Sequence, residues 1–152
     1  MKIFSIVSLS IFSSAYAQTG LTVQTAEGFV SGVLVSQSVR QFLGIPYAQA
    51  ARWEPPQGAA ARSATLEATQ FGDSCIQQLS GGNKEFLTLV GLGDQAVSVS
   101  ENCLSLNIWA PSTNRKQGTS VLIWIYGGGF EFGTVRFLNN PLIKWFYFIS
   151  HY

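Results

Sequence analysis

The sequence has few of the residues that most catalytic and nucleic-acid-binding sites require. Its 152 residues contain one histidine, His151, so a histidine-dependent site would have to use that residue or none. Nine Lys and Arg stand against eight Asp and Glu, which is not the basic surplus of a nucleic-acid-binding protein. The two cysteines have no nearby histidine to complete a metal-ligand set. We therefore expect no metal site and no nucleic-acid partner.

Charge is also scarce, while apolar residues are plentiful. The chain is 11% charged and 47% hydrophobic, which excludes an intrinsically disordered protein. Its length suits one domain of ordinary size. The three glycines Gly127, Gly128 and Gly129 lack the Gly-Lys-Ser/Thr of a phosphate loop and the spacing of a dinucleotide fingerprint. We therefore expect no cofactor.

The N-terminal residues Met1–Ala17 have the three parts of a secretory signal peptide. Lys2 supplies a basic start, an apolar run follows, and small residues precede a cleavage site between Ala17 and Gln18. The run is shorter than the roughly 20 apolar residues that a membrane-spanning helix needs, so we expect no stable membrane span. The alternative is a buried N-terminal strand or helix. The sequence thus predicts a secreted, extracellular protein.

Secretion exposes the two cysteines to an oxidising compartment. Cys75 and Cys103 make one possible pair, and the alternative is two free buried thiols. A disulfide between them would close the loop over residues 75–103 in the unfolded chain. By the chain-entropy argument, it would add about 3–4 kcal/mol to the free energy of unfolding.

Runs of β-branched and apolar residues between turn residues predict strands in the middle of the chain. A hairpin turn is expected at Ala26–Gly28, and Pro46 should end one strand. Residues 48–69 are expected to be loop-like or weakly helical, and residues 71–101 irregular. The expected strands are Thr22–Thr25, Phe29–Val35, Val39–Ile45, Leu104–Trp109 and Val121–Tyr126.

The last of these runs, Val121–Tyr126, leads directly into the three glycines. Its continuous apolar character predicts a strand buried on both faces. Glycines let the backbone adopt positive φ and let a ligand approach the main chain. Backbone N–H groups released at such a strand end could point at one spot and stabilise a developing oxyanion. The alternative is a plain glycine turn after a core strand.

Three segments, in order, resemble the type-B carboxylesterases. The first is Phe42–Ala48, followed by Arg52-Trp53 and Pro55-Pro56. The second is Ser100–Pro111 around Cys103, and the third is Ser120–Gly133 with the glycines. The resemblance implies the α/β-hydrolase fold, N-terminal portion only: a small antiparallel N-terminal sheet plus the first strands of the central sheet.

The resemblance also assigns roles to matching residues. Gly128 and Gly129 match the glycines whose N–H groups face the oxyanion, and Gly127 shapes the turn. Cys75 and Cys103 match a family disulfide. The substrate implied is a small-molecule or lipid ester. A choline ester is not expected, because the loop between the cysteines has no Trp to hold a quaternary ammonium group.

The sequence departs from the family by what it lacks. It contains no Gly-x-Ser-x-Gly, so the catalytic Ser, acid and His are expected to be absent and His151 is not expected to be catalytic. Residues Gln18–Thr134 are expected to be the N-terminal part of a carboxylesterase domain, truncated before the nucleophile and inactive alone. The aromatic-rich tail Val135–Tyr152 is not expected to belong to the fold; the alternative is a real hydrophobic strand or anchor. A non-catalytic secreted binding or adhesion module is the alternative function.

Overall fold

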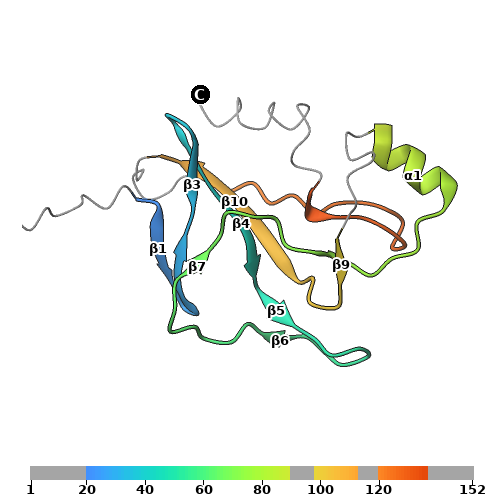
Figure 1. Ribbon diagram of the computed structural model, residues 1–152, viewed down its shortest axis with the longest axis horizontal. Helices are drawn as coiled ribbons and strands as arrows, with labels where there is room; N and C mark the ends of the chain where they lie inside the picture. Colours follow the sequence, from blue (N-terminus) through green and yellow to red (C-terminus); the bar gives the residue numbers. More distant parts are fainter. Residues whose placement is uncertain (1–19, 90–97, 113–119, 137–152) are drawn as a thin grey trace, which may run out of the picture.

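The computed structural model describes residues 20–89, 98–112 and 120–136, which form two three-stranded sheets and two short strand pairs (Figure 1). The expected signal peptide, its cleavage site at Ala17 and Gln18, and His151 lie outside the described residues, as does most of the tail. In the described part of the chain, no helix has the length and apolarity to cross a membrane.

The first sheet begins with the expected hairpin. Strands β1 (Thr22–Thr25) and β2 (Gly28–Ser31) pair antiparallel, and β7 (Leu66–Glu67) adds to β2 in parallel. The Thr25 hydroxyl accepts a hydrogen bond from the Glu27 N–H at 3.2 Å and donates one to the Gly28 carbonyl at 2.8 Å. Gly28 has a φ of 123°, which an L side chain rarely adopts, so glycine is required at this turn.

The second sheet is antiparallel throughout, with the order β10-β4-β3. Its strands are β3 (Val33–Ser36), β4 (Val39–Pro46) and β10 (Ser105–Pro111), which confirms the expected strands over 39–45 and 104–109 to within two residues. The expectation of one strand over Phe29–Val35 is wrong, because the chain changes sheets at Gly32. A Cβ there would collide with the Gln41 carbonyl and the Phe42 ring, so only glycine allows this close approach.

The core joins the two sheets through a small apolar cluster. Val30 of β2, Phe42 of β4 and Ala68, just beyond β7, are each at most 4% exposed. Ile45 and Leu66 pack against them. The cluster thus holds one face of each sheet against the other.

The segment 48–69 contains no helix; it forms the antiparallel pair β5 (Ala48–Gln49) and β6 (Gln57–Gly58), followed by β7. The segment 71–101, expected to be irregular, contains α1 (Gly81–Leu87), whose N-cap is Ser80 with its side chain accepting from the Asn83 N–H. It also contains the parallel pair β8 (Ser74–Cys75) and β9 (Val99–Ser100).

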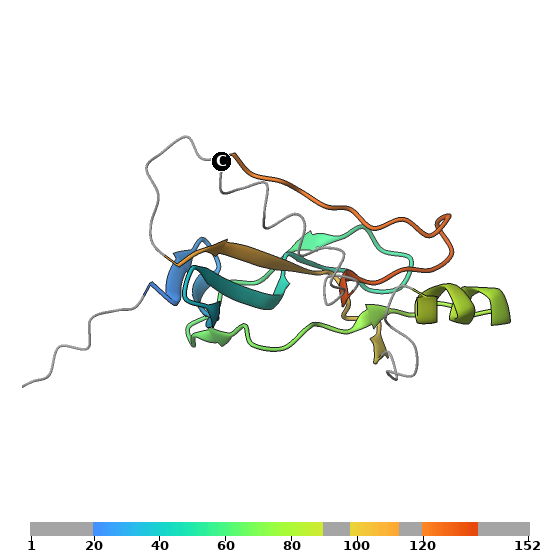
Figure 2. The ribbon, with the colours of Figure 1, turned by 90° about the horizontal axis from the view of Figure 1, so that it is seen from above.

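The expected buried strand over Val121–Tyr126 is wrong. This segment belongs to no sheet of the described chain, and Figure 2 shows it as a coil outside the sheets. Val121 and Ile125 are each 84% exposed. A strand buried on both faces requires neighbouring strands in a sheet, and no strand of the described residues pairs with this segment.

Candidate functional site

The three glycines form a tight turn rather than the end of a strand. Gly128 has a φ of 138°, Gly129 of 63° and Phe130 of 64°. The N–H groups of Glu131 and Phe132 both donate to the Gly128 carbonyl, at 3.1 and 3.3 Å. The backbone therefore reverses direction around a single acceptor, and the positive φ angles favour glycine at positions 128 and 129.

Glycine is required at Gly128 for a second reason, because a Cβ there would collide with the Phe132 carbonyl. At Gly129 no heavy atom lies within 4 Å of an added Cβ, so glycine is favoured there by φ alone. Gly127 also has open space.

The N–H groups of Gly128 and Gly129 donate no hydrogen bond to any other described residue. Gly129 is exposed and Gly128 half-buried, so both lie near the surface of the described structure. These two donors could therefore hydrogen-bond an anionic oxygen brought to the turn.

The far end of the turn is buried. Gly133 and Thr134 are both buried, and the Thr134 hydroxyl lies 2.6 Å from the Ser74 hydroxyl, which is also buried. The Phe132 ring makes an edge contact with Phe86 of α1, with 5.8 Å between the ring centroids. The turn thus has an exposed tip at Gly129 and a buried base at Gly133 and Thr134.

Comparison with known proteins places these features in a family. The sequence profile described as "Carboxylesterase family" matches residues 19–142. The chain belongs to the carboxylesterase family. Fumonisin B1 esterase of Sphingopyxis macrogoltabida is 40% identical over 114 residues, which cover 72% of this chain and 19% of that protein. The chlorogenic acid esterase of Aspergillus niger is 36% identical over 83% of this chain and 26% of its own length.

A solved structure titled PNB esterase shares the fold, with a TM-score of 0.61 and 32% identity over 74% of this chain and 22% of that chain. The described sheets are therefore the N-terminal portion of an α/β-hydrolase fold, as the sequence predicted. The chain spans about a fifth to a quarter of the length of these relatives. The boundaries at residues 17 and 134 stay predictions.

In this member of the carboxylesterase family the expected disulfide is present. Cys75, at the end of β8, is bonded to Cys103 ahead of β10, and the Cα atoms are 4.9 Å apart. Near it, the Arg52 Nε donates to Glu101 at 2.8 Å in an exposed ion pair. The disulfide closes the loop between the cysteines, and the ion pair connects that loop to the segment between β5 and β6.

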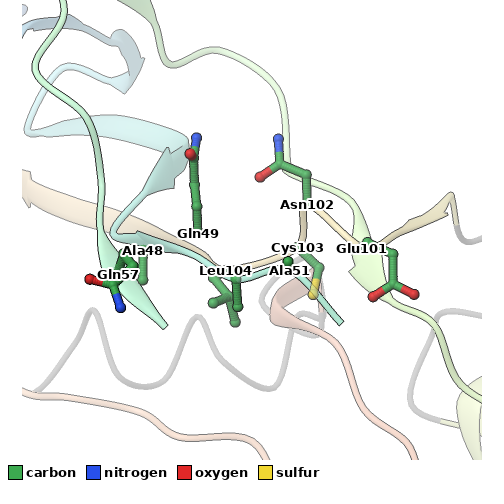
Figure 3. A pocket seen from close by; sticks show the side chains of 9 residues that line it. Ala48, Gln49, Ala51, Gln57, Glu101, Asn102, Cys103 and Leu104 are labelled. Atoms are coloured by element: carbon green, nitrogen blue, oxygen red, sulfur yellow. The ribbon is translucent and has the colours of Figure 1, made fainter. Parts of the chain in front are cut away.

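An open depression of about 530 Å³ lies beside the disulfide (Figure 3). It is lined by β5, β6 and the residues around Cys103, and Figure 3 shows the Gln49 and Asn102 side chains pointing to the same side. None of the three glycines lines it, and its one cysteine is oxidised. Among the described residues, no group of three His, Cys, Asp or Glu could hold a metal. The glycine turn is thus the candidate site.

Sequence reasoning missed the residues that hold the base of the turn. The Ser74 hydroxyl bonds the Thr134 hydroxyl from 60 positions away, and the Gln77 carboxamide bonds Gly133 from 56 positions away. Single polar residues so far from their partners carry no periodic or motif signal. The position of Ser74 and Gln77 beside Cys75 is the one sequence feature that points to them.

Proposed function

We propose that the glycine turn of this sequence supplies the oxyanion-binding part of a secreted carboxylic-ester hydrolase. The observation that carries the proposal is the turn at Gly128 and Gly129. It presents two backbone N–H groups without a partner in the described structure, at an exposed tip on a buried base. Donors held in place before reaction cost no reorganisation when charge develops, which is the condition for stabilising a transition state.

The proposed reaction is acyl transfer to a serine followed by hydrolysis. The serine oxygen attacks the ester carbonyl while a histidine takes its proton, and the carbonyl oxygen becomes an oxyanion. The alcohol then leaves with that proton, and water releases the acid by the same route in a second step. The N–H groups of Gly128 and Gly129, with one from the residue after the serine, would bind the oxyanion, while Gly127 shapes the turn.

The printed sequence contains no Gly-x-Ser-x-Gly, so the proposed nucleophile lies outside these 152 residues. Two donors without a nucleophile have no oxyanion to stabilise. We therefore expect the 152 residues to show no turnover by themselves.

The substrate proposed is a small-molecule or lipid ester. Two relatives carry names that denote esters of small molecules, fumonisin B1 and chlorogenic acid, and another is a bile salt-activated lipase. A choline ester is not proposed, because residues 76–102 include no Trp. The signal-peptide pattern of Met1–Ala17 and the Cys75–Cys103 disulfide support secretion.

The test is an assay of p-nitrophenyl acetate and butyrate with two proteins. One is the product of the complete transcript, and the other is the 152-residue chain. The proposal expects saturable turnover from the first and only background hydrolysis from the second. A complete product that contains a Gly-x-Ser-x-Gly and still hydrolyses neither ester nor longer-chain homologues would overturn it.

A further inference from the structure

The side chain of Gln77 makes two hydrogen bonds to one residue at the base of the glycine turn. Its Oε1 accepts from the Gly133 N–H at 2.8 Å, and its Nε2 donates to the Gly133 carbonyl, also at 2.8 Å. The same Nε2 donates to the Cys75 carbonyl at 3.1 Å. The carboxamide thus bonds the Gly133 backbone as a neighbouring strand would. Its own orientation is fixed by the hydrogen bond to the Cys75 carbonyl.

Gly133 is suited to this contact because it has no side chain. A Cβ there would collide with the Tyr126 ring, and the residue is buried. The backbone of Gly133 is therefore enclosed by the Tyr126 ring on one side and bonded by Gln77. Two hydrogen bonds to one residue fix its orientation as well as its position.

The hydrogen bonds continue from Gly133 to the tip of the turn. The preceding residue, Phe132, donates its N–H to the Gly128 carbonyl. That carbonyl belongs to the same planar peptide unit as the Gly129 N–H, and in a trans peptide the two point in opposite directions. Fixing the Gly128 carbonyl against Phe132 therefore fixes the direction in which the Gly129 N–H points.

Gln77 is itself held by the covalent framework. It lies two residues after Cys75, whose disulfide to Cys103 connects it to the start of β10. The hydrogen bond from Arg136 Nε to the Gly72 carbonyl, at 3.3 Å, joins the segment around Cys75 to the residues that follow the turn. The segment around the first cysteine is thus bound to the residues that close the turn.

We propose that Gln77 is the positioning residue for the oxyanion-binding N–H group of Gly129. This inference rests on the proposed function, since it assigns a role within the same site. Gln77 lies outside the three motif segments and bonds the base of the turn, not its exposed tip. Its effect is to keep this donor aimed at the place where the oxyanion develops.

The experiment compares Gln77→Ala and Gln77→Glu with Gln78→Ala in the product of the complete transcript. Gln78 is the adjacent, exposed glutamine and is the matched control. Donors that act in the transition state affect kcat, so kcat per titrated active site should fall about 10- to 100-fold in Gln77→Ala, with KM within about twofold. A carboxylate keeps the acceptor but sets an anionic oxygen against the Gly133 and Cys75 carbonyls, so Gln77→Glu should lower kcat at least as much as Gln77→Ala.

Hydrogen exchange of the peptide that spans residues 128–134 is the second measurement. It should be about tenfold faster in Gln77→Ala than in Gln78→Ala, because Gly133 loses its partner. Equal kcat in the two alanine variants, or equal exchange rates, would overturn the inference. If the wild-type protein hydrolyses no ester, the proposed function fails, whereas faster exchange would still support Gln77 as the residue that positions the turn.

Discussion

Removing the buried contact between Ser74 and Thr134 should destabilise the protein in a non-additive way. Their hydroxyl oxygens are 2.6 Å apart, and the two residues are 2% and 3% exposed. The perturbation is a double-mutant cycle of Ser74→Ala and Thr134→Val, chosen because both substitutions remove the hydroxyl and leave the shape nearly unchanged.

The two single variants should differ in magnitude. Thr134→Val leaves the Ser74 hydroxyl buried without a partner among the described residues, which costs about 1–3 kcal/mol of unfolding free energy. Ser74→Ala leaves the Thr134 oxygen still accepting from the Arg136 N–H at 3.2 Å, so about 0.5–1.5 kcal/mol is expected. The double variant has no buried hydroxyl at either site, so it should lose less than the sum, with a coupling of about 0.5–1.5 kcal/mol.

The assay is urea unfolding followed by tryptophan fluorescence, with the free energy extrapolated to water. The control is Ser36→Ala, since the Ser36 and Ser38 hydroxyls form an exposed pair at 3.4 Å. That variant should change stability by less than about 0.5 kcal/mol. Additive single effects, with a coupling below about 0.3 kcal/mol, would refute the reasoning that these two hydroxyls bond each other in the folded protein.

Two further predictions concern the framework. Phe42→Ala removes the largest side chain of the core cluster, which is 4% exposed. It should lower the free energy of unfolding by about 3–5 kcal/mol in the same urea assay. A loss below about 1 kcal/mol would show that the cluster does not join the sheets. Replacing both Cys75 and Cys103 by Ser opens a loop with a sequence separation of 28 and should cost about 3–4 kcal/mol. Calorimetry of the oxidised protein and the double variant checks this, and equal melting temperatures would contradict it.

Local sequence signals predicted the elements that local interactions determine. The hairpin at Ala26–Gly28 follows from a turn glycine between two runs rich in β-branched residues, and β4 ends at Pro46 as expected. The pairing of Cys75 with Cys103 needed only their count and the expected compartment. In each case the determining chemistry lies within a few residues or in a covalent bond.

Elements set by distant contacts could not be predicted in this way. The break at Gly32 depends on the Phe42 ring, which arrives from another strand. The apolar run at 121–126 has the composition of a buried strand, yet its state depends on neighbours that the described chain does not supply. The glycines were visible in the sequence, whereas the carboxamide of Gln77 that bonds Gly133 was not.

The central claim is that the N–H groups of Gly128 and Gly129 bind an oxyanion. The most direct measurement is NMR of the complete-transcript product labelled with [15N]glycine, before and after a trifluoromethyl ketone forms its tetrahedral adduct with the nucleophile. The amide protons of Gly128 and Gly129 should move downfield together, because each donates to a charged oxygen. Those of Gly81 and Gly82, in α1, should not move. Unchanged Gly128 and Gly129 resonances in the inhibited enzyme would contradict the claim.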